Sequence, residues 1–296
     1  MSKIAKISVL LSFLGLWLTS FLKNEYQVIV GFILVLSFGI VHGANDLLII
    51  KKINPKSISI LRLLFKYIVL VFVAVLLFGF VPWLAMFLFI IFSSYHFGEQ
   101  HWENRIIKSN EIIKVLFEIN YGGFILLLLF YFHQKEVLDI LFSITDIQMR
   151  FINIPLLLKI NGFILICLGL YNSYKSEIFK NEVIKELLYL IVFGIIFKVA
   201  NLIWGFTIYF IFWHSIPSLS DQIKYLYKDV TLRNSITYFK SAFLYWIISM
   251  FGIGVLYLLL KDTKIFDAIF FSFLAAITFP HVIVIKRMYS ENKKTE

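Results

Sequence analysis

Long apolar runs are the feature that most restricts how this chain can fold. The chain has 296 residues, of which 60% are hydrophobic and 16% are charged, whereas an average soluble domain is about 45–50% apolar and about 25% charged. About 20 consecutive apolar residues cross the hydrocarbon core of a bilayer as one helix. No polar segment is long enough to form a soluble domain. The sequence therefore predicts an all-α, polytopic membrane helix bundle that forms a single transmembrane domain over residues 1–296.

Ten stretches are candidate spans. They lie at about 5–22, 27–50, 60–80, 82–98, 113–132, 153–173, 183–200, 202–219, 241–260 and 266–286. If the N-terminus is cytoplasmic, the cytoplasmic segments hold 20 Lys and Arg residues and the outer segments hold six. Basic residues gather on the cytoplasmic side of membrane proteins. We therefore expect about ten transmembrane helices, both termini in the cytoplasm, and a multi-pass protein of the cell inner (plasma) membrane.

Charge and cysteine usage exclude two classes of site. The net charge of +10 is spread over the loops instead of forming a patch, so nucleic acid is not an expected partner. The one cysteine, Cys167, lies in an apolar run. The sequence therefore contains neither a disulfide framework nor a cysteine-based metal site.

Histidines within the apolar spans are the main functional signal. An ionisable side chain inside a membrane is costly unless it has a partner. Each of four histidines lies 12 to 15 residues after the start of an even-numbered span, which places it roughly 18–22 Å into the bilayer at 1.5 Å per residue. The four are His42, His96, His214 and His281. His133 ends the fifth span at the opposite face, and His101 lies at a cytoplasmic helix end.

Four histidines at one depth favour a metal site over ordinary hydrogen bonds between helices. Neutral imidazole is the commonest metal ligand, and nitrogen ligands suit transition metals better than calcium or magnesium. Four neutral ligands leave a divalent ion its full charge, which favours a redox iron, Fe(2+), over a structural zinc. No separate cofactor-binding residues are expected.

Two carboxylates accompany these histidines. Asp46 follows His42 by four residues and Glu99 follows His96 by three, so each pair shares a helix face. Such a carboxylate could orient a ligand imidazole through its other nitrogen. We therefore predict that Asp46 and Glu99 contribute to catalysis, against the alternative that they are interfacial charges.

Aromatic side chains are abundant near the histidine layer. The chain has 33 phenylalanines, and most must face lipid or pack helices. Those near the histidines could instead form an apolar cleft for a long hydrocarbon: Phe92, Tyr95, Phe97, Trp102, Tyr209, Phe212, Trp213 and Phe279. Gly122 and Gly123 are typical of close helix packing.

Four short motifs occur in order on separate spans: H-G-A-N-D, S-S-Y-H-F-G-E, F-W-H-S-I-P-S and F-P-H. In these motifs, from about residue 35 to 287, the sequence resembles the Brp/Blh family of membrane β-carotene 15,15′-dioxygenases. The resemblance implies a non-haem iron enzyme that uses dioxygen to split β-carotene into two retinal molecules. Membrane lipid, β-carotene and dioxygen are the implied partners, with a microbial rhodopsin as receiver of the retinal.

The resemblance also implies a ligand set. His42, His96 and His214 match family histidines that bind iron, whereas some members have a further histidine where this chain has Ser218. His281 is our candidate for the fourth ligand, with Ser218 and Asp46 as the other positions to consider.

Other functions remain open at this point. A membrane di-iron desaturase needs about eight clustered histidines, and this chain has six scattered ones. A haem-carrying electron-transfer protein or a transporter could also use histidines within the membrane, although a transporter should show hydropathy repeats and no convincing one is present.

Overall fold

The computed structural model describes residues 3–53, 60–103, 110–149, 151–260 and 263–295. Helices account for nearly all of this part of the chain, and it contains no strand. This confirms the predicted all-α class. The backbone reason is that only helices and closed barrels satisfy their own N–H and C=O groups in lipid.

The helices divide between two compact units. Unit 1 comprises Met1–Ile33, Ile90–Asp139 and Gln148–His214, and unit 2 comprises Leu34–Phe89, Ile140–Ile147 and Ser215–Glu296. The chain passes from one unit to the other several times, and three of the helices contribute to both: α2 (Asn24–Gly43), α5 (Pro82–Trp102) and α7 (Gln134–Thr145).

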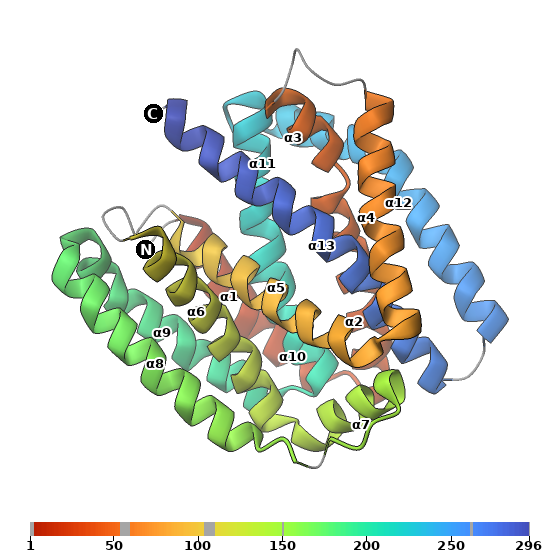
Figure 1. The fold of residues 1–296 in the computed structure, drawn as a ribbon, viewed down its shortest axis with the longest axis horizontal. Helices are drawn as coiled ribbons and strands as arrows, with labels where there is room; N and C mark the ends of the chain where they lie inside the picture. Colours follow the sequence, from red (N-terminus) through yellow and green to blue (C-terminus); the bar gives the residue numbers. More distant parts are fainter. Residues whose placement is uncertain (1–2, 54–59, 104–109, 150, 261–262, 296) are drawn as a thin grey trace. The chain divides into compact units, whose positions relative to one another are not determined.

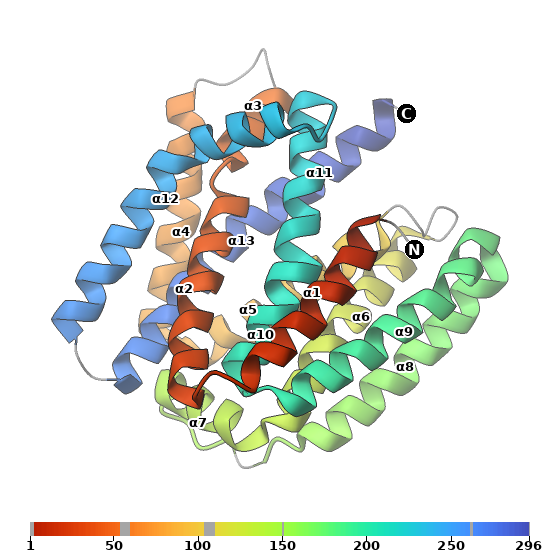
Figure 2. The same ribbon diagram turned by 180° about the vertical axis from the view of Figure 1, so that it is seen from behind.

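Unit 1 is built on a layer of three long helices that lie side by side in Figures 1 and 2. These are α6 (Glu111–Phe132), α8 (Ile154–Lys175) and α9 (Glu177–Val199), each of which packs against the other two. Two helices pack on α9, namely α1 (Lys3–Thr19) and α10 (Leu202–Tyr209). A short π-helix, η1 (Phe210–Ser215), follows α10 directly and begins the passage to unit 2.

Polar residues cap four helices of unit 1. Asn110, Asn153, Ser176 and Asn201 each accept a hydrogen bond from a backbone N–H in the first turn of the following helix. Such side chains satisfy N–H groups that have no partner within the helix. The caps therefore explain where these four apolar helices begin.

A close helix contact places the part of α5 that carries His96. A Cβ atom added at Gly98 would lie 1.8 Å from the backbone oxygen of Glu118, and one added at Gly122 would lie 1.9 Å from that of Ser94. Glycine is therefore required at both positions for α5 and α6 to approach so closely. The packing role predicted for Gly122 is confirmed.

Unit 2 is organised around α13 (Thr263–Thr295). This helix packs against α3 (Asp46–Ile53), α4 (Ile60–Phe80) and α12 (Leu232–Leu260). The remaining helix, α11 (Ile216–Tyr227), contacts α3 and α12. A small apolar core joins α3 to α13 through Ile49, Ile285 and Met288.

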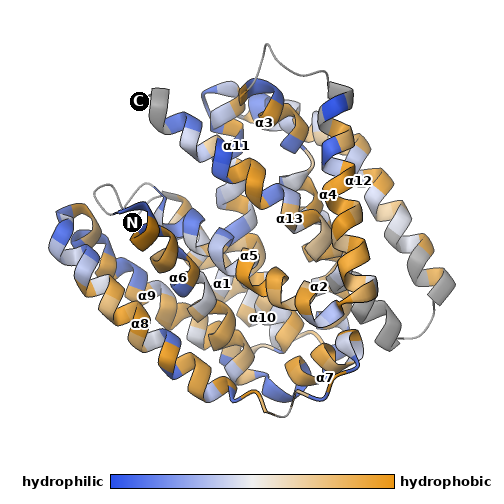
Figure 3. Cartoon of the chain, viewed as in Figure 1, coloured by the Kyte–Doolittle hydropathy of each residue, from blue (hydrophilic) through white to orange (hydrophobic). Residues whose placement is uncertain are grey.

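Four helical segments in the described ranges are long and apolar enough to cross a membrane: Asn24–Ile53, Glu111–Phe132, Ile154–Lys175 and Leu202–Tyr227. Two shorter apolar helices lie at Ile4–Thr19 and Leu64–Phe80. Hydrophobic residues run along much of α4 and α8 (Figure 3), and only 6% of the apolar window in α8 is buried. So large an exposed apolar surface indicates a membrane protein. The count of ten spans stays a prediction.

Candidate functional site: two buried histidine pairs

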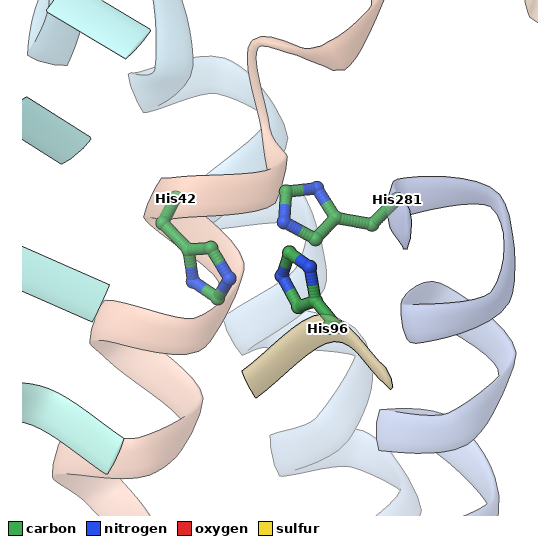
Figure 4. A group of neighbouring side chains, drawn as sticks. All are labelled: His42, His96 and His281. Atoms are coloured by element: carbon green, nitrogen blue, oxygen red, sulfur yellow. The ribbon is translucent and has the colours of Figure 1, made fainter. Parts of the chain in front are cut away.

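Unit 2 brings together two histidines that are 239 positions apart in the sequence. His42 lies one residue before the end of α2, and His281 lies in α13. Their rings meet edge to face, with centroids 4.7 Å apart and an angle of 85° between the planes. Figure 4 shows the two side chains on their helices. The two residues are 5% and 3% exposed. Two buried imidazoles at this separation are unusual as mere packing, because each carries two polar nitrogens.

Hydrogen bonds define the tautomer of both rings. His42 Nδ1 lies 3.2 Å from the backbone oxygen of Phe38, which can only accept, so the proton is on Nδ1. His281 Nδ1 lies 2.9 and 3.1 Å from the two carboxylate oxygens of Asp46, so it donates as well. In a neutral ring with a proton on Nδ1 the lone pair is on Nε2. Both rings therefore present the nitrogen type that binds a metal.

Asp46 is the buried anchor of this pair. It is 1% exposed, and its Oδ2 also accepts a hydrogen bond of 3.2 Å from the hydroxyl of Tyr67 in α4. A carboxylate that holds the second nitrogen of a histidine is the arrangement found around metal ligands in proteins. The prediction that Asp46 shares a helix face with His42 is wrong, because α2 ends at Gly43 and Asp46 begins α3 after a turn. Its imidazole partner is His281.

Unit 1 contains a second pair of the same kind. His96 in α5 and His214 in η1 have ring centroids 4.7 Å apart and an angle of 78° between the planes. They are 2% and 1% exposed. The ring of Phe97 also meets that of His214, with centroids 4.7 Å apart. Each unit thus contributes two of the four predicted histidines, side by side.

The π-helix that carries His214 was not predicted from the sequence. Side chains hold its backbone and its neighbours: Gln100 donates to the His214 carbonyl at 2.8 Å, and Ser8 donates to the Phe212 carbonyl at 2.6 Å. Trp213 donates through its indole N–H to the hydroxyl of Ser12. π-Helical turns often occur at functional sites. Pro217, the second residue of α11, is the one local signal of irregular backbone in the sequence.

Glu99 has a different environment from that of Asp46. It is 2% exposed, and its Oε1 accepts a hydrogen bond of 2.5 Å from the hydroxyl of Tyr95. Close by in the sequence, Lys114 donates to Glu103 at 2.6 Å and lies 3.5 Å from Glu118. Glu99 is thus one of several buried acidic residues in unit 1.

The remaining two histidines have structural partners. His101 Nδ1 lies 3.2 Å from Glu186 Oε2, and His133 Nε2 lies 2.8 Å from the backbone oxygen of Phe197. Both contacts join α9 to other parts of unit 1. Several predicted cleft aromatics also pack within unit 1: Trp102 stacks on Phe179 at 4.4 Å, and Trp213 meets Phe193 at 4.8 Å.

Ser218 is placed by a hydrogen bond that the sequence did not reveal. It is 1% exposed, and its hydroxyl accepts from Gln222 Nε2 at 3.1 Å. Gln222 also donates to the backbone oxygen of His42 at 2.8 Å. Sequence reasoning missed Gln222 and Tyr67, whose only signal is a polar side chain in an apolar context.

Comparison with known protein families gives a match over most of the chain. The sequence model of the family described as beta-carotene 15,15'-dioxygenase matches residues 33–289, which include all four paired histidines and Asp46. No curated protein and no solved structure matches the chain. The match covers most of the 296 residues and agrees with the Brp/Blh resemblance in the four histidine motifs. The chain belongs to the beta-carotene 15,15'-dioxygenase family.

Proposed function

We propose that this protein cleaves β-carotene at its central double bond with dioxygen, at an Fe(2+) ion held by His42, His96, His214 and His281. Family membership supports a β-carotene 15,15′-dioxygenase-like activity. The observation that carries the metal site is the pairing of buried imidazoles, with ring centroids 4.7 Å apart in each unit.

The donor set fits a transition metal. His42 and His281 each have the proton on Nδ1 and the lone pair on Nε2, and Asp46 holds His281 in this tautomer. Imidazole nitrogens suit iron, and the four histidines would hold such an ion through neutral nitrogen donors. Iron bound there would supply the one-electron chemistry that lets dioxygen react with a closed-shell alkene.

The reaction balances without another reactant. One C=C bond of β-carotene and the O–O bond of dioxygen are broken, and each carbon of the former double bond receives one oxygen atom. The products are two molecules of all-trans-retinal. No external reductant or proton is consumed, so the chain needs to bind the hydrocarbon, exclude water and orient the central bond.

The surroundings of the histidines are suited to a hydrocarbon substrate. β-Carotene dissolves in the membrane core, and an enzyme for it needs its metal at the depth of the apolar helices. Phe97 lies against the His214 ring, and aromatic residues near the histidines, including Phe92, Phe212 and Phe279, are candidates for an apolar cleft. A microbial rhodopsin is the proposed receiver of the retinal.

The same proposal includes a topology. We place the chain in the inner (plasma) membrane as one transmembrane domain with about ten spans and both termini in the cytoplasm. The distribution of basic residues supports this orientation, and the repeated passage of the chain between the two units supports one domain.

Expression in cells that accumulate β-carotene tests the function. We expect the cells to lose their colour and to produce retinal, with iron and oxygen supplied. His214→Ala should abolish retinal formation and also lower the iron content of the purified protein. We expect the same two losses in His281→Ala. His133→Ala is the matched control, because its ring bonds to a backbone oxygen, and it should retain iron.

Two results would contradict the proposal. The first is unchanged β-carotene in the presence of folded, iron-supplied protein. The second is full iron content in His281→Ala, which would mean that three histidines and another group hold the metal. A strong Soret band in the purified protein would instead indicate haem.

A further inference from the structure

Side chains from α11 and α12 bond to the short segment between α2 and α3, next to the histidines of unit 2. Helix α2 ends at Gly43 and α3 begins at Asp46. His42 precedes this break and Asp46 follows it, so the geometry of the two residues depends on the turn between them. The last carbonyl groups of a helix have no N–H partner within that helix, and the His42 carbonyl is one of them.

Side chains from α11 bind the first side of the break. Gln222 Nε2 donates to the His42 carbonyl at 2.8 Å, and Gln222 is itself fully buried at 0% exposed. The hydroxyl of Tyr238 in α12 donates to Gln222 Oε1 at 2.7 Å. The amide of Gln222 is therefore fixed at both ends, which makes its orientation toward the His42 carbonyl unambiguous.

Helix α12 binds the second side of the break through Asn45. The Nδ2 atom of Asn45 donates to the Tyr238 carbonyl at 3.0 Å, and its Oδ1 accepts from the hydroxyl of Ser241 at 2.9 Å. Asn45 is 1% exposed and Tyr238 is 0% exposed. Buried hydrogen bonds of this kind are costly to leave unmade, so they restrict the conformation of the turn.

We infer that Gln222, Tyr238 and Asn45 form a positioning clamp, which holds the α2–α3 break so that His42 and the Asp46–His281 pair keep their relative geometry. The inference rests on the proposed function, because the geometry matters through the metal that these residues would bind. Gln222 bonds to the His42 carbonyl, and Asn45 bonds to the Tyr238 carbonyl and to Ser241. The three clamp residues act through the backbone of the H-G-A-N-D segment.

The clamp also accounts for Ser218. Its hydroxyl accepts from the same Gln222 Nε2 atom that binds the His42 carbonyl. In this chain Ser218 therefore supports the clamp, and His281 stays our proposed fourth ligand. A Cβ atom at Gly43 would lie 3.7 Å from His281 Nδ1, so a side chain larger than alanine at this turn would press on the ring.

Tyr238→Phe is the sharpest variant, since it removes one hydroxyl and keeps the ring. Tyr289→Phe is the matched control, because Tyr289 is also buried in unit 2 and also donates one hydrogen bond, at 3.0 Å to Asp221. Gln222→Leu is a second test of the same clamp, and Gln222→Glu keeps the shape while removing the amide donor.

Two measurements on purified full-length protein separate positioning from general stability. The first is amide hydrogen exchange in peptides covering residues 40–50, which we expect to become faster in Tyr238→Phe and Gln222→Leu than in Tyr289→Phe. The second is the affinity for iron, measured alongside the absorption spectrum of the Co(2+)-loaded protein. We expect a loss of affinity of about tenfold, typical of residues that orient ligands, and a changed spectrum in the clamp variants alone.

The outcomes are distinguishable. The clamp would be overturned if Tyr238→Phe and Gln222→Leu both exchanged at the wild-type rate at residues 40–50. It would also be overturned if their metal affinity and spectrum equalled those of Tyr289→Phe, even if the protein binds iron. If the wild-type protein binds no metal, the proposed function fails, and the exchange measurement still decides whether these side chains hold the break.

Discussion

Asp46 and Glu99 show how differently two buried carboxylates can be used. Asp46 bonds to the ring nitrogen of His281 and accepts from Tyr67. Glu99 accepts from Tyr95, which lies one turn earlier on the same helix. A carboxylate that bonds to a ligand imidazole increases its basicity and fixes its tautomer, whereas the hydrogen bond that Glu99 accepts comes from a tyrosine hydroxyl.

We therefore predict that Asp46→Asn lowers activity more than Glu99→Gln. The amide that replaces the Asp46 carboxylate would keep an oxygen acceptor for His281 but lose the negative charge, and we expect about a tenfold or greater loss of iron affinity and retinal formation. The amide that replaces the Glu99 carboxylate would still accept from Tyr95. Retinal yield per unit of membrane-bound enzyme is the measurement, and equal or reversed losses would show that Asp46 does not support a ligand.

The buried ion pairs of Lys114 lead to a second prediction about a single residue. Its ammonium group is buried with Glu103 at 2.6 Å and Glu118 at 3.5 Å. Removing one member of a buried ion pair leaves an uncompensated charge and costs about 3–5 kcal/mol. Lys114→Met should therefore sharply lower the thermal stability of the detergent-purified protein.

The control is Lys180→Met, which breaks an exposed pair with Glu177. Exposed pairs contribute little, roughly 0–1 kcal/mol. Similar unfolding temperatures for the two variants would mean that Lys114 is not needed to compensate the acidic residues around it.

At the scale of the elements, the approach of α5 to α6 decides where His96 lies. Gly98 follows His96 by two residues, and its Cα faces the backbone of Glu118. Ser94 makes the reciprocal contact with Gly122. The two glycines remove the side-chain atoms that would separate these helices, so the position of His96 depends on residues that have no chemistry of their own.

Gly98→Ala and Gly122→Ala should each separate the two helices and lower both stability and iron content. The new Cβ would lie less than 2 Å from a backbone oxygen, and backbone cannot move aside as a flexible side chain does. Gly79→Ala is the control, because no atom lies within 4 Å of its added Cβ. The measurements are thermal unfolding and iron content. Equal values for the three variants would contradict the role of Gly98 and Gly122 in the close approach of α5 and α6.

At the scale of the whole molecule, the membrane determines which surfaces can be apolar. Large hydrophobic side chains are exposed along several helices, among them Phe163 and Leu170 of α8 and Phe72 of α4. In water such surfaces would aggregate, whereas in a bilayer they face lipid. The basic residues of the loops then predict the orientation of the chain.

Reporter fusions test the orientation. A cytoplasmic reporter joined after residue 296 should be active, and so should one inserted in loop 51–59, because the predicted even spans run toward the cytoplasm. A reporter that works only outside the cytoplasm should be active when it is placed after Lys135, and a cytoplasmic reporter should be inactive there. Active external reporters at either of the first two positions would refute the ten-span topology.

The all-α membrane fold class and the prediction of a histidine site follow from the sequence alone. Long apolar runs must be helical, because a lipid environment provides no partner for free backbone groups. Four histidines in such runs indicate a site, because their burial is costly without a role. These inferences depend on composition and on position along each run, which are properties of the sequence itself.

The tertiary structure decided which residues meet. The interval of four from His42 to Asp46 places both on one face only in an uninterrupted helix, and the helix is broken between them, so Asp46 bonds to His281 from a helix far along the chain. The π-helix at His214 and the Gln222 bond to the His42 carbonyl likewise depend on packing. Periodicity relates residues within one helix, whereas a hydrogen bond between helices exists only once the helices are packed.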